Sequence, residues 1–136
     1  NARHHSNRAP QFTHGGVVFA PKPRDYVISV PRKVKRLALK GALTSKVNEG
    51  EMIVLDKIAL DAPKTKLVAA MLKKLGCEKK TLLVLPGKDD SVTRAAHNIP
   101  GVTCAYVNTI NVLDILAHDK FVITQDAVKL VEEVYA

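Results

Sequence analysis

Aromatic side chains are scarce in this sequence of 136 residues, since they make up 4% of it and tryptophan is absent. The hydrophobic content is nevertheless 46%, which is ordinary for a globular protein. The core must therefore be built from Val, Leu, Ile and Ala. At this length the chain fits one domain, which can bury about 68% of the surface that the unfolded chain exposes.

Cysteine is also rare, and the two that occur, Cys77 and Cys104, stand alone in the sequence. Neither belongs to a C-x-x-C pair or to a Cys/His cluster with the spacing of a zinc site. A disulfide between them is an open alternative, but reduced and buried thiols are the expectation. Reduced thiols fit a reducing compartment.

Long apolar runs are missing as well. No run reaches the roughly 18 residues that a membrane span requires, and no signal peptide is recognisable, so we expect no membrane partner. The chain begins at Asn1 without an initiator methionine. We therefore expect a processed or truncated product with residues missing upstream.

Negative charge is nearly absent from the first 46 residues, where Asp25 alone opposes ten Lys and Arg residues. This stretch sums to +9 against +8 for the whole chain, so the remaining residues sum to −1. Each Lys or Arg that neutralises a phosphate releases a condensed counterion. Such a concentration of positive charge predicts a polyanion partner.

Residues 1–30 form what we call the arm, which has neither a helical nor a strand period. Gly15, Gly16 and Pro10 punctuate its first half, which we expect to be solvated and mobile when free. Residues 17–19 are expected to be a short extended run. Pro21 and Pro23 then exclude helix and favour an open path across a surface.

A helical period begins at Pro31, which is well placed at the first position of a helix that Gly50 would end. Apolar residues at three- and four-residue spacing predict a buried stripe of Val34, Leu37, Ala38, Ala42, Leu43 and Val47. The opposite face would be a basic ridge of Arg32, Lys33, Lys35, Arg36, Lys40 and Lys46.

Short apolar runs then alternate with amphipathic segments. Residues 52–56 read as a buried strand, and residues 81–87, 102–107 and 121–124 as three more. Helices are expected over 63–76, from Asp89, Asp90 or Ser91 to about Asn98, from Asn111 to about Ala117, and from Thr124 or Gln125 to the end. We predict an α/β fold: a mostly parallel, doubly wound (Rossmann-like) sheet with helices on both faces, plus the extended basic N-terminal arm. The domains would be 1–30, the extended basic arm, and 31–136, a globular α/β body.

Catalytic motifs are absent. Residues 86–88 resemble a phosphate loop only faintly, and no G-x-G-x-x-G, G-x-S-x-G or H-E-x-x-H occurs. Asp56, Asp89 and Asp90 could form a magnesium pocket, although Asp89 and Asp90 are better explained as helix caps. We predict no enzyme, no cofactor and no metal. The alternative is a small α/β enzyme or magnesium-dependent nucleotide-binding domain that uses these three carboxylates.

Several short motifs follow one another in order along the chain. They are Ala-Arg at 2–3 with Ser6, Arg-Ala-Pro-Gln at 8–11, Gly-Gly-Val-Val-Phe at 15–19, Pro-Lys-Pro-Arg-Asp-Tyr at 21–26, Lys-Val-Lys-Arg-Leu-Ala at 33–38, Ala-Pro-Lys-Thr-Lys at 62–66, Asn-Ile-Pro at 98–100, Val-Leu-Asp-Ile at 112–115, Asp-Lys at 119–120, Ala-Val at 127–128 and Glu-Glu-Val at 132–134. Over essentially all 136 residues the chain resembles large-subunit ribosomal protein number four, bacterial type. It departs from the family pattern at His4-His5, at Phe12, where Trp is frequent, and at His97, where Arg is usual.

The resemblance implies a structural constituent of the large ribosomal subunit that binds ribosomal RNA, supports assembly and contributes to the peptide exit tunnel. It implies a cytoplasmic, ribosomal location and neighbouring ribosomal proteins as partners, including number twenty-two at the tunnel constriction. The resemblance makes residues 1–30 one limb of an extended basic loop that penetrates ribosomal RNA. The family's loop tip, which would precede Arg3, and its first strand and helix are absent here. Binding to its own messenger RNA is known for some relatives and is a third possible role.

The expected RNA-binding residues fall into three groups. In the arm, Arg3 and Arg8 would contact phosphates, and Phe12 or the histidines would stack on bases. Gly15 and Gly16 would let the backbone approach RNA closely. The full set is Arg3, His4, His5, Arg8, Phe12, His14, Gly15, Gly16, Lys22 and Arg24 in the arm, Arg32, Lys33, Lys35, Arg36 and Lys40 on the ridge, and Lys64 and Lys66 at the start of the second helix.

Overall fold

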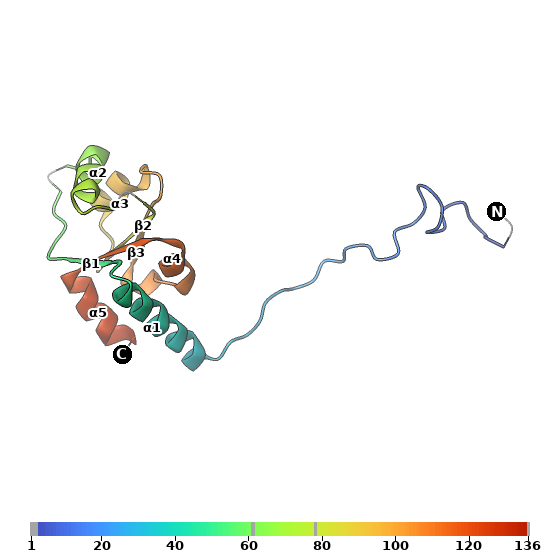
Figure 1. Cartoon of the computed structure of the whole chain (residues 1–136), viewed down its shortest axis with the longest axis horizontal. Helices are drawn as coiled ribbons and strands as arrows, with labels where there is room; N and C mark the ends of the chain where they lie inside the picture. Colours follow the sequence, from blue (N-terminus) through green and yellow to red (C-terminus); the bar gives the residue numbers. More distant parts are fainter. Residues whose placement is uncertain (1–2, 61, 78, 136) are drawn as a thin grey trace.

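The computed structural model describes residues 3–60, 62–77 and 79–135. Figure 1 shows a body of strands and helices from which the N-terminal arm runs out as one long extension. The elements of the body are α1 (Arg32–Asn48), β1 (Met52–Leu55), α2 (Thr65–Lys74), β2 (Thr81–Leu85), α3 (Asp90–His97), β3 (Val102–Tyr106), a 3-10 turn η1 (Val107–Thr109), α4 (Val112–Ala117), β4 (Lys120–Thr124) and α5 (Gln125–Tyr135).

The four strands form one sheet in the order β1-β4-β2-β3, and all three pairings are parallel. The last strand in the sequence, β4, therefore lies between the first two. Leu82 of β2 pairs with Phe121 on one side and with Thr103 on the other. The predicted parallel α/β sheet is confirmed.

Helices cover both faces of this sheet, as Figure 1 shows with α2 and α3 on one side and α1 and α5 on the other. Alternate residues of β2 supply the two aliphatic cores. Leu82 and Val84 pack with residues of α1, α4 and α5, whereas Leu83 and Leu85 pack with residues of α2 and α3. Strand β2 is buried along its whole length because it has a strand on each side and a helix layer on each face.

The expectation that residues 52–56 form a buried strand is wrong in one respect. The strand exists as β1, but it lies at the edge of the sheet and pairs only with β4. Val54 is consequently 54% exposed. The apolar run Met-Ile-Val-Leu carries no information about which strands will lie beside it, so sequence could not separate an edge from a centre.

The predicted apolar face of α1 is only partly right, since Ala42 is buried and Leu43 packs against the core but the other predicted members do not. The residues that it buries are Leu39, Ala42 and Lys46, whereas Val34 is 50% and Leu37 70% exposed. The helix starts one residue later than expected, since Pro31 stands at the N-cap position, and Gly50 follows its end with a φ of +65°. The buried stripe is rotated about the helix axis from the apolar stripe in the sequence.

Lys46 accounts for part of this rotation. It was predicted on the exposed ridge, but its ammonium group donates a hydrogen bond to Glu51, just before β1, at 2.5 Å. Only 7% of the Lys46 side chain and 27% of the Glu51 side chain are exposed. An ion pair with a partner five residues along the chain removes the cost of leaving a buried ammonium group uncompensated.

This ion pair predicts an acid-sensitive contribution to stability. The hydrogen bond from Lys46 holds the pKa of the Glu51 carboxyl below its ordinary value. A carboxyl with a lowered folded-state pKa stabilises the fold above its unfolded pKa, and this contribution is lost as pH falls through the folded pKa. We expect Glu51→Gln to lower the Tm at about pH 7 and to flatten its decrease between about pH 6 and pH 3. Thermal unfolding followed by circular dichroism measures both, and parallel Tm–pH curves for the two proteins would contradict the assignment.

Several expected helix ends are confirmed. The Asp89 carboxylate accepts hydrogen bonds from the backbone N–H groups of Ser91 and Val92 at the start of α3. The Asn111 side chain accepts one from Asp114 N–H at the start of α4. Both contacts satisfy amide groups that the first helical turn leaves without partners.

The arm has no regular helix or strand among its described residues. Residues 17–19, which were expected to be extended, instead contain a turn at 18–19, and residues 20–30 run without secondary structure. In the described part of the chain, no helix is long and apolar enough to cross a membrane.

Candidate RNA-binding surface

The outer end of the arm closes on itself. Gly16 N–H donates to the Arg8 carbonyl at 2.8 Å, and within this closure Phe12 N–H donates to Ala9 and Gly15 N–H donates to Phe12. Residues 8–16 therefore form a loop whose two ends are joined by a backbone hydrogen bond. We call residues 3–16 the arm loop.

A ring contact links two parts of this loop. The rings of His4 and Phe12 meet edge to face with their centroids 5.5 Å apart. The Gln11 amide nitrogen lies 2.8 Å from His4 Nδ1. Phe12 is half-buried by these contacts, whereas Phe19, farther along the arm, is 94% exposed.

Gly15 and Gly16 have different surroundings, although sequence predicted one role for both. A Cβ atom on Gly15 would lie 2.0 Å from the Ala9 carbonyl oxygen, a distance that no side chain tolerates. A Cβ on Gly16 would have Arg8 O at 3.4 Å, which is an ordinary contact. The absence of a side chain at Gly15 thus serves the closure of the loop itself.

The middle of the arm carries Lys22 and Arg24 on an exposed path. The Arg24 guanidinium lies 4.3 Å from the centre of the Tyr26 ring, a cation–π contact that leaves its N–H groups available at the edge. Tyr26, Val27 and Ile28 are all strongly exposed. This exposed apolar run lies between Pro23 and Pro31 and outside every strand.

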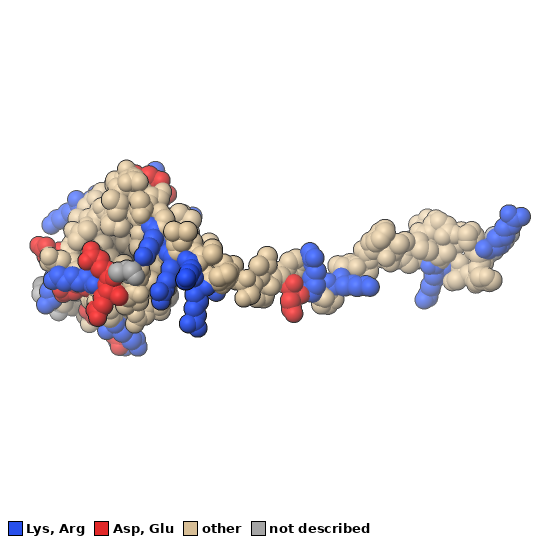
Figure 2. Space-filling view, turned by 90° about the horizontal axis from the view of Figure 1, so that it is seen from below, with Lys and Arg blue, Asp and Glu red and all other residues tan. Residues whose placement is uncertain are grey.

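The basic ridge of α1 keeps five of its six predicted members. Arg32, Lys33, Lys35, Arg36 and Lys40 are exposed, and the first turn of the helix contains no acidic residue. Within the described ranges, the ion pairs are Lys46–Glu51 and Lys88–Asp90, so none of the five ridge cations is neutralised by a carboxylate. Figure 2 shows positively charged side chains gathered where the body meets the arm.

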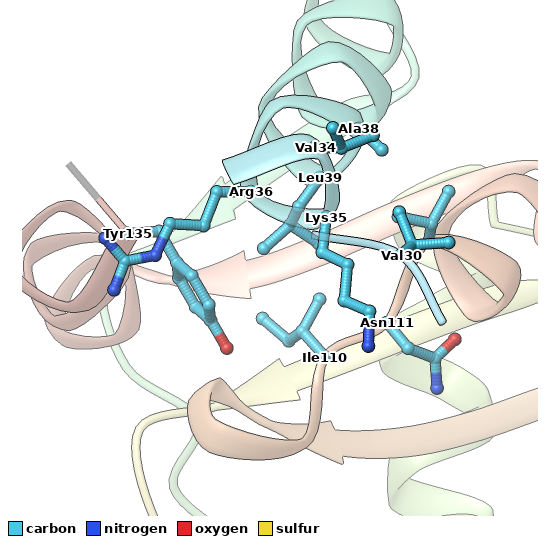
Figure 3. Close-up of a pocket in the computed structure, with 10 residues that line it drawn as sticks. Val30, Val34, Lys35, Arg36, Ala38, Leu39, Ile110, Asn111 and Tyr135 are labelled. Carbon is cyan, nitrogen blue, oxygen red and sulfur yellow. The ribbon is translucent and has the colours of Figure 1, made fainter. Parts of the chain in front are cut away.

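An apolar hollow of about 510 Å³ lies beside the ridge. Figure 3 shows Lys35 and Arg36 extending from α1 over this hollow, with Ile110 and Tyr135 on its other side. Tyr135 is held in place because its hydroxyl donates to the Val107 carbonyl at 3.0 Å. Sequence reasoning did not find the hollow, because residues of α1, the segment before α4 and the end of α5 meet there only in the folded body.

Lys64 and Lys66 lie where they were predicted, at the exposed start of α2, which begins at Thr65. Lys64 occupies the N-cap position without a side-chain cap, so the first amide groups of the helix have no partner from this residue. Because α2 and α1 cover opposite faces of the sheet, these lysines form a patch separate from the ridge.

The three carboxylates proposed for the enzyme alternative do not form one site. Asp56 and Asp89 line a hollow of about 150 Å³ at the carboxyl ends of β1, β2 and β4, but Asp89 also caps α3. Asp90 pairs with Lys88 at 3.5 Å. In the part of the chain that the structure describes, no three His, Cys, Asp or Glu side chains are arranged to hold a metal ion directly.

Contacts and burial also describe the surroundings of His118 and of the two cysteines. The His118 ring lies 2.7 Å from the Asp114 carbonyl oxygen and 2.9 Å from the Thr103 hydroxyl, and these contacts join α4 to β3. Cys77 and Cys104 are both free thiols, and burial raises the pKa of each. A raised pKa keeps a thiol protonated and unreactive near neutral pH.

Comparison with known proteins identifies the same family over nearly the whole chain. Residues 1–134 match the model of the ribosomal protein L4/L1 family. Proteins named large ribosomal subunit protein uL4 are similar to it: 61% identity in Alkaliphilus metalliredigens, 59% in Alkaliphilus oremlandii and 55% in Clostridium novyi, each over 135 residues. Each match covers 99% of this chain and 65% of the relative, so the chain spans about two thirds of the length of these relatives.

Proposed function

Because the chain belongs to the ribosomal protein L4/L1 family, we propose that it is a structural, non-catalytic constituent of the large ribosomal subunit that binds ribosomal RNA. In that setting it supports subunit assembly, contributes to the peptide exit tunnel and acts in the cytoplasm. The alternative of a magnesium-dependent enzyme has no comparable support, since Asp89 and Asp90 are engaged in a helix cap and an ion pair.

The observation that carries this proposal is the row of cations at the root of the arm. Five exposed Lys and Arg residues follow one another along the first nine residues of α1, and among the described residues no acidic side chain pairs with them. A surface of this kind repels itself in isolation and is stabilised when it neutralises phosphates. Arg can also bind a phosphate with two parallel hydrogen bonds.

The arm extends this surface away from the body. Arg3 and Arg8 lie in the arm loop, and Lys22 and Arg24 follow on the extended segment. An exposed, extended segment of this kind fits a cleft between RNA helices, where it can contact phosphates on both sides. Contacts of this type set position, and specificity then comes from the shape of the RNA.

Lys64 and Lys66 supply a second, separate contact in this proposal. Two ammonium groups beside uncapped helix amides are suited to one phosphate group. Because this patch lies across the sheet from the ridge, the body would touch RNA on two sides.

Further proposed partners rest on the resemblance to ribosomal protein number four. They are neighbouring ribosomal proteins, including number twenty-two at the tunnel constriction, and the chain's own messenger RNA. The messenger would use the same cationic surface, because a phosphate backbone presents the same charges in either RNA.

A pair of charge-neutralised variants tests the proposal. We expect Lys33→Gln with Lys35→Gln to weaken binding to large-subunit RNA about tenfold and to reduce the slope of log K against log salt by about 1.5. Lys73→Gln with Lys74→Gln is the control, since it removes the same charge from exposed positions on α2. Filter binding over a range of salt concentrations measures both quantities.

The control variant shows whether RNA binds specifically at the ridge or responds only to the net charge of the chain. Equal losses in the two variants would mean that RNA responds only to total charge. Unchanged affinity of the ridge variant, or no binding of RNA by the unsubstituted chain, would overturn the proposed function.

A further inference from the structure

We propose that the arm loop binds RNA as one closed unit, in which His4 and Phe12 hold each other rather than stacking on unpaired bases. The inference rests on the proposed RNA binding and assigns different roles within it. Phe12 and His4 become positioning residues, while the exposed cations of the loop make the contacts.

The first support is the engagement of the Phe12 ring. Its edge-to-face contact with His4 places the two rings in one of the arrangements that aromatic pairs favour. Gln11 contacts the same imidazole, so three side chains of the loop hold one another in position. The ring contact and the partial burial of Phe12 reduce the ring surface that is open to a stacked base.

The second support is the backbone conformation of the loop. Two residues that are not glycine, Arg3 and His14, adopt left-handed conformations with φ of 65° and 62°. L-residues rarely adopt this region, and such strain persists where the surroundings enforce it, frequently at ligand contacts. His14 is followed by Gly15, whose missing Cβ admits the Ala9 carbonyl oxygen. Strain and close approach therefore coincide at the point where the loop shuts.

The closed loop presents positive charge outward. Arg3 and Arg8 are exposed, and within the described ranges no carboxylate pairs with either arginine. A compact loop with a cationic surface fits a cavity walled by the sugar–phosphate backbone. It would be recognised through shape and phosphates rather than through individual bases.

A double-mutant cycle separates this arrangement from base stacking. The variants are His4→Ala, Phe12→Ala and the combination of both, with affinity for large-subunit RNA as the readout. If the rings support each other, each single variant should bind RNA about two- to tenfold more weakly than the unsubstituted chain. The double variant should then bind no more weakly than the weaker-binding of the two single variants. Losses that multiply would show that each ring contacts RNA independently and would overturn the proposal. So would unchanged affinity in both single variants.

The two glycines give a second, matched test. Gly15→Ala should weaken RNA binding about tenfold or more, because a Cβ at 2.0 Å from Ala9 O forces the loop open. The RNA affinity of Gly16→Ala should stay within about twofold of that of the unsubstituted chain, since the added Cβ would make only an ordinary contact. Equal effects of the two substitutions would overturn the closed loop. If RNA binding and the loss on neutralising Lys33 and Lys35 persisted in that case, the proposed function would stand.

Discussion

Removal of residues 1–30 is expected to reduce the affinity of the chain for large-subunit RNA by at least about a hundredfold and to lower the salt slope by about three. The deleted segment carries Arg3, Arg8, Lys22 and Arg24 against the single acidic Asp25. Each phosphate contact contributes about 0.7 to 0.9 to the slope, so four contacts account for the expected change. The ridge and the patch at Lys64 would retain weaker binding.

The body should survive this deletion. Helix α1 begins only at Arg32, and residues 17–29 are exposed along the arm. Val30 is the residue of the segment that lines the hollow beside α1, and it is itself partly exposed. The circular dichroism spectrum and the Tm should therefore change little, so that a loss of affinity reports on RNA contacts.

A charge-neutral arm provides the control for this deletion. The variant Arg3→Gln, Arg8→Gln, Lys22→Gln and Arg24→Gln keeps the length of the arm and its glycines but removes its positive charge. We expect it to reproduce the loss of salt slope, and to bind more tightly than the deletion if the arm loop adds contacts that do not depend on charge. A deletion that left affinity and salt dependence unchanged would contradict RNA binding by the arm.

The fold was predictable where local rules and tertiary structure agree. The run Thr-Leu-Leu-Val-Leu at 81–85 is apolar at nearly every position, and this is what a central parallel strand requires. Asp89 and Asn111 cap the helices that they were expected to cap. In each case the residues that determine the element lie within a few positions of one another, so the pattern is visible in the sequence.

Prediction was wrong where a distant neighbour decides the outcome. The face of α1 is set by α4 and by the sheet, so Leu39 is buried while Leu37 remains exposed. Lys46 could turn inward because Glu51 lies within reach across the end of the helix. Neither fact follows from apolar periodicity, which ranks residues by type and does not identify their partners.

The candidate site was likewise predictable only in part. Its cations could be named from the sequence, because exposed charge is a property of composition and local pattern. The contact between His4 and Phe12 and the closure at Gly15 could not, since they join residues six to eight apart in a segment without periodicity. The sequence therefore identified the charged residues of the arm, but it did not show which side chains of the arm contact one another.

Charge reversal on the ridge is expected to weaken RNA binding about a hundredfold without unfolding the body. The variant Arg32→Glu with Arg36→Glu changes the ridge by four charge units and converts two phosphate-binding groups into repelling ones. Both side chains are exposed, and within the described ranges neither forms an ion pair whose loss could destabilise the fold.

The position of Arg32 makes this test sharper than an ordinary charge reversal. It begins α1, whose first turn has no acidic residue, and the positive end of a helix dipole favours carboxylates there. Glutamate at this position should therefore leave the Tm unchanged or raise it slightly, while affinity for RNA falls. A loss of affinity that accompanies a lower Tm would point to unfolding instead of a lost contact.

A second reversal on the body controls for the change in total charge. Lys79→Glu with Lys80→Glu also changes the chain by four units, at exposed positions before β2 that are outside the proposed surface. We expect it to cost much less affinity than the ridge variant, because charges beyond about one Debye length of the bound phosphates are screened. If the two variants lost the same affinity, the ridge would contribute only through the net charge of the chain. The arm would then be the remaining candidate for a located RNA contact.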